Sequence, residues 1–526
     1  MKKLLMATVA AAAMFSAVPS MAIERGGSLT FARYDDSTLI DPIYADRNPD
    51  IWMVTNLYDT LLRTEADGKT VTAGLAESYD VAEDGQSVTL TLRDGIKFSD
   101  GTPIEGKDVV FSLTRASDAD LSPWAGLLSS IEEVTSDDNQ ITISLNQPDP
   151  TIVLMLATFN TAIVSADAFE AASGETDQEK AQSIAIDGFV GSGPFMMKSH
   201  QRGTLMQFGA NPHYWRDGED GEPLPYMDGI NFLVIPDDAT RILKLQAGEV
   251  DAAEFIPFAR VGELEADENI NMELFPSTRI IYSPINTRET RADGSANPLA
   301  DVMLRQALNY ATNKEALVQL VLQGAGKPVS SGLMASTTQL ATDNGPIYQY
   351  DLDKAKALIA EAGVPDGTEL TLTILAGSAD DAIILSALQQ MWSQIGIDLN
   401  VEQVDGPTRG AKNRSGEFDI HTYGWVNDVN DPAQVAGWLG YYPTAKAVGT
   451  GWNNEEFNSL YEASNVEMDP AKRAEQYARM QAIYNEAAPL LFMYETPFAV
   501  ALSADVQGYV QTPLGNNEFA STWIER

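Results

Sequence analysis

The stretch between residues 73 and 112 constrains the fold of this chain more than any other part of the sequence. Its Asp84-Gly85 pair is typical of a tight turn between two strands, and residues 87–92 alternate polar and apolar side chains at the strand period of two. Two further turns, with a short strand at residues 96–98 between them, lead to a helix that begins near Gly106. The stretch therefore predicts a small meander of strands followed by a helix.

The same stretch contains the spacing of a phosphate-binding loop, because Gly101 and Gly106-Lys107 are separated as in the Walker A motif. Asp108 stands where that motif needs a serine or threonine to contact magnesium. A carboxylate at this position would repel phosphate, so the sequence argues against a phosphate-binding loop.

Short motifs occur here in the order LAESY, EDG, LR-x-GIKF, SDGTP and KDVVFS. This order resembles the signature of the extracytoplasmic solute-binding proteins of peptide and nickel ABC importers, family 5. Four later segments resemble motifs of the same family: GSGPF at residues 191–195, NPHYW at 211–215, GEVD at 248–251 and LRQALNYA at 304–311. A chain of 526 residues is long enough for two or three lobes.

The resemblance implies an α/β fold, a two-lobed periplasmic binding protein of the class II type with an extra subdomain inserted in the first lobe. The implied domains are a first lobe at residues 23–55, 186–282 and 490–526, an inserted subdomain at 56–185 and a second lobe at 283–489. The chain would then cross between the lobes twice, near Tyr282 and near Pro489. Two crossings form a hinge about which the lobes can close over a ligand.

Residues 1–22 have the layout of a secretory signal peptide. Lys2 and Lys3 precede an apolar run that ends near residue 18, and Ser20-Met21-Ala22 predicts cleavage after Ala22. No later apolar run is long enough to cross a bilayer. The sequence has no cysteine, and therefore neither a disulfide framework nor a lipid-anchored cysteine. These features predict a protein that diffuses freely in a Gram-negative periplasm.

The formal net charge is −41 at pH 7, from 75 acidic and 34 basic residues. Such a surface repels nucleic acid and anionic lipid, so these partners are not expected. The charge is typical of a very soluble protein and carries no direct information about the ligand.

Two helices are predicted from apolar spacing, one over residues 51–62 and one over residues 301–311. The second helix should turn Asn309 and the following Lys314 toward solvent. Residues 489–494 predict a strand that returns to the first lobe.

Sequence motifs of catalysis are missing. The three histidines, His200, His213 and His421, form no H-E-x-x-H, and the chain has no G-x-S-x-G and no G-x-G-x-x-G after a strand. The acidic cluster at residues 217–222 does not fit the spacing of a calcium-binding loop, so a solvated surface loop is expected there. The sequence predicts no enzyme, no cofactor and no metal site.

The best candidate for a binding site is HTYGWVNDVNDP at residues 421–432. Residues 418–423 predict a strand, and the chain then breaks through Gly424, so Trp425 and Asp428 follow the carboxyl end of a strand, where ligands bind in open α/β sheets. The segment resembles the family's GWxxDxxDP motif, whose first aspartate binds the α-ammonium group of a peptide. The resemblance assigns this role to Asp428. The residues alone leave equally open that Asp428 caps its own loop and Trp425 lies in the core.

Further candidates follow from position in the chain. Tyr423 and Gly424 stand beside Trp425, and a glycine would let backbone groups approach a ligand. Five weaker candidates lie at strand ends, in a loop of the insert or on the strand at 489–494: Asp35, Asp36, Trp124, Phe492 and Tyr494. Aromatic residues lie in the core more often than they contact a ligand, so we expect about two of the five to touch it.

One segment departs from the family pattern. Dipeptide binders carry an arginine after the strand equivalent to residues 370–374, where it pairs with the ligand carboxylate, but residues 375–381 read LAGSADD. Either Arg409 or Arg414 replaces that arginine, or the ligand is longer, amidated or not a peptide. Nickel is not expected, because His421 should pack on its strand.

Together these features predict the periplasmic substrate-binding component of an ABC importer. It would capture a small peptide or peptide-like cationic solute by hinged closure of its lobes and deliver it, as a monomer, to the permease subunits in the membrane. A second hypothesis keeps the fold and replaces the peptide by an oligosaccharide, an opine or a similar solute. A third, less favoured, is a secreted hydrolase.

Overall fold

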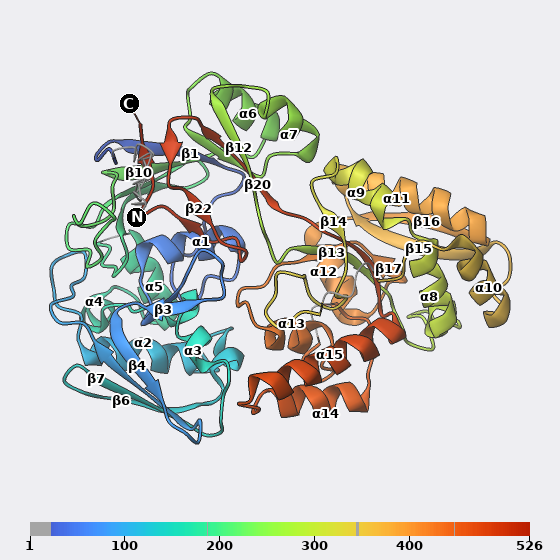
Figure 1. Cartoon of the computed structure of the whole chain (residues 1–526), viewed down its shortest axis with the longest axis horizontal. Helices are drawn as coiled ribbons and strands as arrows, with labels where there is room; N and C mark the ends of the chain where they lie inside the picture. Colours follow the sequence, from blue (N-terminus) through green and yellow to red (C-terminus); the bar gives the residue numbers. More distant parts are fainter. Residues whose placement is uncertain (1–22, 187, 343–346, 446–447, 526) are drawn as a thin grey trace, which may run out of the picture.

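The computed structural model describes residues 23–186, 188–342, 347–445 and 448–525. The predicted signal peptide lies outside these residues. Figure 1 shows two lobes side by side, with both ends of the described chain in the same lobe. Within the described part of the chain, no helix is both long and apolar enough to span a membrane.

The first lobe is built on a seven-stranded sheet in the order β12-β20-β11-β1-β10-β9-β8. Its central strand β1 pairs in parallel with β10 and β11, and the outer strands run antiparallel. Leu29 and Phe31 of β1 point into the lobe's core. The strands are β1 (Ser28–Arg33), β8 (Phe195–Gln201), β9 (Leu205–Ala210), β10 (Gly229–Val234), β11 (Ala252–Glu254), β12 (Ile270–Phe275) and β20 (Phe498–Ser503). The helices are α1 (Asn48–Leu57), α6 (Asp238–Gln246) and α7 (Phe258–Leu264), and four short strands end the chain: β21 (Val506–Gln507), β22 (Val510–Gln511), β23 (Asn517–Glu518) and β24 (Trp523–Ile524).

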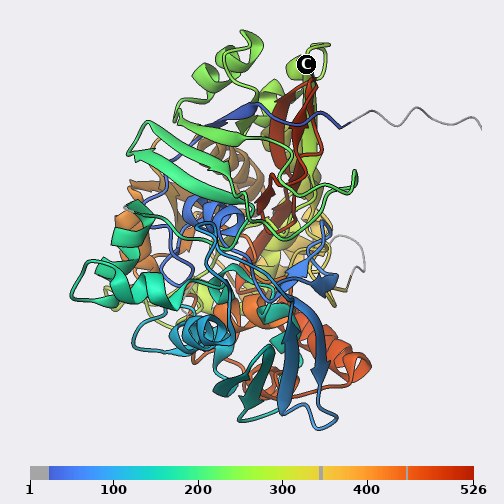
Figure 2. The same cartoon turned by 90° about the vertical axis from the view of Figure 1, so that its left-hand side faces the viewer.

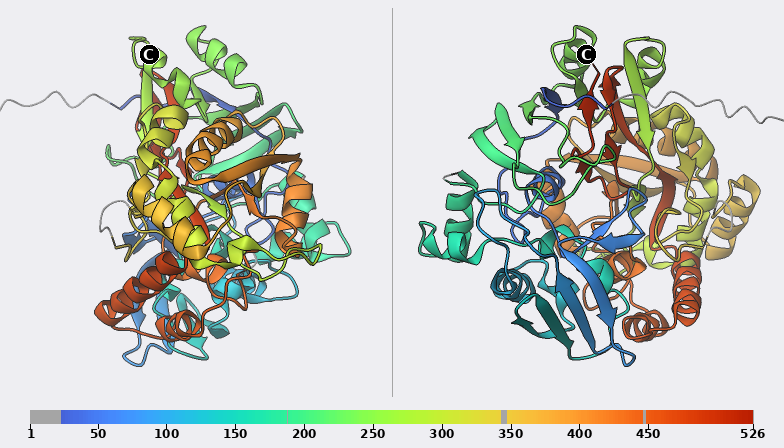
Figure 3. Two further views of the ribbon diagram at one scale, coloured as in Figure 1. Left: turned by 90° about the vertical axis from the view of Figure 1, so that its right-hand side faces the viewer. Right: turned by 60° about the vertical axis from the view of Figure 1, so that its left-hand side comes forward.

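An insert between α1 and β8 carries its own antiparallel sheet, in the order β4-β5-β7-β6. Strand β5 occupies Ser87–Leu92, as the alternation predicts, and Val88, Leu90 and Leu92 are buried. The other elements are β2 (Leu62–Thr64), β3 (Val71–Ala73), β4 (Ala76–Val81), β6 (Ile131–Asp137), β7 (Gln140–Leu145), α2 (Gly106–Ser117), α3 (Ile152–Met155), α4 (Ala166–Ala171) and α5 (Asp177–Ile186). In Figures 2 and 3 this sheet lies at the end of the molecule opposite α6 and α7.

The second lobe contains a parallel sheet, β16-β15-β17, and a sheet in the order β14-β19-β13-β18. Its strands are β13 (Ile280–Pro284), β14 (Lys327–Pro328), β15 (Thr368–Leu375), β16 (Ile397–Val404), β17 (Ile420–His421), β18 (Tyr423–Trp425) and β19 (Leu490–Glu495). Its helices are α8 (Val302–Ala311), α9 (Lys314–Leu322), α10 (Leu352–Ala362), α11 (Ala379–Trp392), α12 (Gly406–Ser415), α13 (Pro432–Leu439), α14 (Glu455–Ser464) and α15 (Pro470–Ala487). Figure 1 shows α14 and α15 below the sheets, beside the insert.

Two short connections join the lobes. Residues 276–279 link β12 to β13, and residues 496–497 link β19 to β20. The backbone N–H of Thr496 donates to the carbonyl oxygen of Arg279 at 3.1 Å, so the two connections lie side by side. The strand predicted to return to the first lobe is β19, which instead pairs with β13 in the second lobe; the return is made by β20. The predicted crossings near Tyr282 and Pro489 therefore lie a few residues from the connections, and the domain boundaries stay a prediction.

The helix predicted over residues 51–62 is shifted in the structure. Helix α1 begins at Asn48, where Pro49 suits the first turn, and ends at Leu57. The GSGPF segment causes this early end, because the Gly193 N–H donates to the Leu57 carbonyl at 3.0 Å. A Cβ on Gly193 would lie 2.6 Å from the Leu57 carbonyl carbon, so only glycine permits this approach.

Two other local predictions are wrong. Residues 96–98 form no strand, because their pairing with the segment after the turn is limited to one isolated bridge, Lys97 to Pro103. Asn309 and Lys314 are buried, not exposed. The Asn309 amide donates to the Leu490 carbonyl at 3.0 Å, and the Lys314 ammonium donates to the Tyr348 carbonyl at 2.7 Å. Both polar groups are thus accommodated by backbone carbonyls inside the second lobe.

Candidate ligand-binding site

A cavity of about 790 Å³ lies between the two lobes, and the insert contributes to its wall. Its lining includes residues of the first lobe such as Tyr34, residues of the insert such as Trp124, and residues of the second lobe such as Trp425. Seven of the ten predicted site residues line it: Trp124, Arg409, Tyr423, Gly424, Trp425, Asp428 and Tyr494. Contact of these residues with a ligand stays a prediction.

The second-lobe wall is formed where the chain changes sheets. The strand predicted over residues 418–423 is split: β17 pairs with β15, whereas β18 pairs with β13. The change at Thr422 brings Trp425 opposite Ile280, and the Trp425 indole N–H donates to the Asn427 side-chain oxygen at 2.6 Å. These contacts fix the start of the loop that carries Asp428.

Asp428 is half-buried at the cavity wall. Its carboxylate oxygen Oδ2 accepts a hydrogen bond of 2.7 Å from the Gln434 amide, and the Gln434 oxygen accepts the backbone N–H groups of Asp428 and Val429. Within the described ranges it forms no ion pair. Burial raises the pKa of Asp428 to about 6, and the bond from Gln434 acts in the opposite direction. A cation that enters the cavity would therefore meet a poorly solvated carboxylate.

The loop after Asp428 is held from both sides. Asp431 caps α13 through the Ala433 N–H at 2.8 Å, and it forms a buried ion pair with Arg473 at 2.6 Å. Val429 is 1% exposed and packs in a cluster whose other members, including Ile43 and Met155, belong to the first lobe and the insert. The lobes are thus in contact at this loop, directly beside Asp428.

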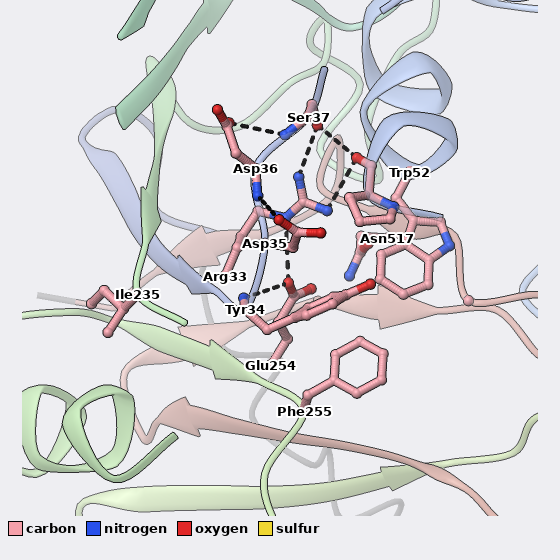
Figure 4. A network of polar contacts seen from close by, with 12 residues as sticks. Arg33, Tyr34, Asp35, Asp36, Ser37, Trp52, Ile235, Glu254, Phe255 and Asn517 are labelled. Atoms are coloured by element: carbon pink, nitrogen blue, oxygen red, sulfur yellow. Dashed lines mark hydrogen bonds and ion pairs between the residues drawn. The ribbon is translucent and has the colours of Figure 1, made fainter. Parts of the chain in front are cut away.

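The first-lobe wall is aromatic. The ring of Phe255 lies 4.5 Å from that of Tyr34 and 5.8 Å from that of Trp52, as Figure 4 shows. Phe255 has φ of 52°, a left-handed conformation that costs free energy in a residue other than glycine. Beneath the rings, Arg33 and Glu254 form a buried ion pair of 3.4 Å. This packing presents the Tyr34 and Phe255 rings to the cavity, whereas Trp52 supports them from the core.

Three predicted site residues do not line the cavity. Asp35 pairs with Arg47, and Asp36 accepts hydrogen bonds from His200 at 3.0 Å and from the Gly203 N–H at 2.7 Å. Figure 4 shows both aspartates in the polar network around Arg33. Phe492 is 0% exposed and belongs to the core of the second lobe. Both aspartates therefore bond protein groups of the first lobe, and neither lines the cavity.

The cavity holds two arginines, Arg279 and Arg409. Arg409 donates to the Thr422 carbonyl at 3.0 Å and lies over the Tyr423 ring. Arg414, the other proposed replacement for the missing arginine, is exposed and does not line the cavity. Arg279, on the connection before β13, is not among the site residues predicted from the sequence. Its position, as a charged residue between two strands where the chain crosses between the lobes, is the one sequence feature that could have indicated a site residue.

Asp380 and Asp381 also line the cavity, at the start of α11. Asp381 is fixed by the Thr422 hydroxyl at 2.6 Å and the Leu375 N–H at 2.9 Å.

His421 is buried and its pKa is lowered to about 4, mainly by burial. No group of three or more metal-ligating side chains was found in the part of the chain that the structure describes.

Comparison with known proteins decides the family. The family model of the bacterial extracellular solute-binding proteins, family 5 (middle region), matches residues 70–446. The chain belongs to the family 5 solute-binding proteins. The family assigned from the motifs is therefore confirmed, and with it an extracytoplasmic solute-binding role.

Similar members of family 5 align over nearly the whole chain. Heme-binding protein A of Haemophilus influenzae is 29% identical, covering 89% of this chain and 87% of that protein. The dipeptide-binding protein of Escherichia coli is 28% identical, covering 89% of each. The structure of the periplasmic binding protein DppA from Helicobacter pylori, in complex with peptide STSA, is 24% identical with a TM-score of 0.80, covering 96% of this chain and 99% of that one. This last likeness confirms the two-lobed family 5 fold.

Proposed function

We propose that this protein is the periplasmic substrate-binding component of an ABC importer and that it captures a small peptide or peptide-like cationic solute. The observation that carries the proposal is Asp428, a poorly solvated carboxylate that faces the interlobe cavity without a cationic partner among the described residues. The dipeptide-binding relative in Escherichia coli and the Helicobacter pylori protein crystallised with a peptide support the choice of ligand class.

Lobe closure supplies the mechanism. A ligand ammonium group loses its water when it enters the cavity, and an ion pair with Asp428 would offset that cost. The hydrogen bond from the Gln434 side-chain amide holds the carboxylate in place, and Tyr34, Phe255 and Trp425 provide flat apolar walls for an extended chain. Because these groups come from both lobes, a ligand binds the closed state better than the open state and shifts the population toward it.

The membrane permease of the importer would be the partner that binds the closed conformation. The ligand would be handed over unchanged, since the protein has a binding role and no chemical step is required. We propose that the protein acts as a monomer and does not bind nucleic acid, in keeping with its net charge of −41.

The proposal is tested by identifying bound ligand. Purified protein is incubated with an equimolar pool of synthetic di-, tri- and tetrapeptides, washed, and denatured, and the released molecules are identified by mass spectrometry. We expect intact peptides with a free amino terminus, and N-acetylated versions of the same pool should be retained far less. Release of no peptide would refute the proposal. Recovery of cleaved peptides would instead support a secreted hydrolase.

A non-peptide solute is the alternative, and the aromatic lining favours it. Among the described residues, nine aromatic residues line the cavity and could stack on a sugar ring or a macrocycle: Tyr34, Trp124, Phe255, Phe258, Tyr423, Trp425, Trp438, Tyr494 and Phe498. In this case Asp428 would accept hydrogen bonds from hydroxyl groups. The Asp428→Asn variant distinguishes a hydroxylated solute from a cationic ligand. Its affinity for a hydroxylated solute would change little, whereas its affinity for a cationic ligand would fall strongly.

A further inference from the structure

The guanidinium of Arg279 stands apart from the other charged groups of the cavity. Arg279 is half-buried, and in the described residues its side chain forms neither a hydrogen bond nor an ion pair. Its backbone is held, because the Arg279 N–H donates to Ser277 at 2.9 Å and its carbonyl accepts from Thr496 at 3.1 Å. A fixed backbone thus carries an unsatisfied cation on the connection between the lobes.

The surroundings of Arg279 come from both lobes. Burial lowers its pKa, and Tyr494, Asp380 and Tyr34 partly offset this effect. Asp380 interacts with it through space without reaching the 4 Å of an ion pair. Such a guanidinium presents several donors to a planar anion, and among the described residues no protein group accepts from them.

The charge at Asp428 is separate from the charge at Arg279. Burial and Gln434 determine the pKa of Asp428, and Arg279 is not among the groups that shift it. Among the described residues, the two groups do not form an ion pair with each other. A ligand that satisfies both must carry a positive group and a negative group at different ends.

We propose that Arg279 binds an anionic group of the ligand, the carboxylate of a peptide with a free carboxyl terminus. This inference rests on the proposed peptide-binding function and specifies the ligand as a zwitterion. It also explains how a chain with Asp380 and Asp381 after β15 could still accept a free carboxylate: the cation comes from the interlobe connection. Arg409 is less suited, because it is already bonded to the Thr422 carbonyl.

The test compares two peptide pools on three proteins. One pool of di-, tri- and tetrapeptides has free carboxyl termini and the other has the same sequences as carboxyl-terminal amides; both keep free amino termini. The wild type should retain the acids about 10- to 100-fold more strongly than the amides, as expected for a hydrogen-bonded charge. Arg279→Gln should lose this preference, because its affinity for acids falls while its affinity for amides stays. The exposed Arg414→Gln is the matched control and should keep the preference.

Each other result is decisive. If the wild type retains acids and amides equally, or if Arg279→Gln loses both pools equally, the assignment of Arg279 is overturned and the peptide-binding function stands. If the wild type retains neither pool, the proposed function fails and the assignment falls with it. Arg279→Gln should unfold at the same urea concentration as the wild type or a higher one, since the guanidinium has no hydrogen bond to lose in the described part of the chain.

Discussion

Replacing Asp428 with asparagine is expected to stabilise the ligand-free protein at neutral pH. The pKa of the carboxyl is about 6 in the folded chain, against an ordinary value of 3.8. A carboxyl whose pKa is raised by folding contributes stability that is fully present below pH 3.8 and lost as the pH rises through 6. The loss at neutral pH is about 3 kcal/mol for this difference in pKa. Asparagine does not ionise and can still accept the bond from Gln434, so it should recover about 2 kcal/mol, allowing for partial contact with solvent.

The same substitution should weaken ligand binding. Removing one member of a buried ion pair costs about 3–5 kcal/mol, which corresponds to a roughly 150- to 5,000-fold loss of affinity for a peptide with a free amino terminus. Stability and affinity are therefore expected to change in opposite directions. This pattern separates a ligand-binding aspartate from one that only caps its own loop, since asparagine caps as well as aspartate and such a change would leave the affinity for the peptide unaltered.

The assay is urea unfolding of ligand-free protein at pH 7.5 and pH 4, combined with calorimetry of a retained peptide at pH 7.5. The gain in stability should be clear at pH 7.5 and almost absent at pH 4, where the wild-type carboxyl is mostly protonated. Asp398→Asn, which removes an exposed carboxylate on β16 outside the cavity, is the control and should change neither quantity. Unchanged affinity of Asp428→Asn for the peptide would refute the reasoning and favour the loop cap, and a lack of any gain in stability at pH 7.5 would show that the carboxylate is not destabilised by burial.

Three further predictions follow from other residues. Asp380→Asn should raise the affinity for free-acid peptides several-fold in calorimetry, because it removes a negative charge that competes for Arg279; unchanged affinity would count against that competition. Val429→Asp should weaken contact between the lobes, seen as a larger radius of gyration in X-ray scattering, because Val429 is 1% exposed in a cluster otherwise supplied by the first lobe and the insert. Burial lowers the pKa of Lys314 from 10.5 to about 7, so stability should rise between pH 7 and pH 10.5. Lys314→Met should flatten that rise in urea unfolding, at the cost of an unpaired Tyr348 carbonyl; a slope equal to that of the wild type would show that Lys314 does not cause it.

Local patterns predicted much of the fold because they report local physics. The alternation at residues 87–92 depends only on which side chains face the insert core, and strand β5 has those bounds. The start of α1 depends on Pro49, but its end depends on Gly193, which arrives from residues far along the chain. Asn309 and Lys314 likewise look solvent-exposed on a helical wheel, whereas distant carbonyl groups accept their hydrogen bonds in the core. A single sequence does not indicate which remote segments come into contact.

Residues of the candidate site were likewise predictable from the sequence where local patterns place them, and not where remote contacts do. Asp428 could be located because glycine, tryptophan and aspartate occur together after a strand, all within one segment. Phe492 and Tyr494 lie two positions apart on β19, so strand alternation places them on one face. A bulge in β19 interrupts this alternation, because Phe492 and Tyr494 pair with the consecutive residues Tyr282 and Ile281 of β13; Phe492 enters the core whereas Tyr494 lines the cavity. Arg279 has no motif around it, and only the pairing of the two interlobe connections reveals that its side chain lines the cavity. The charge that would select a free carboxylate is therefore specified by the hinge, the part of the chain whose position depends on both lobes at once.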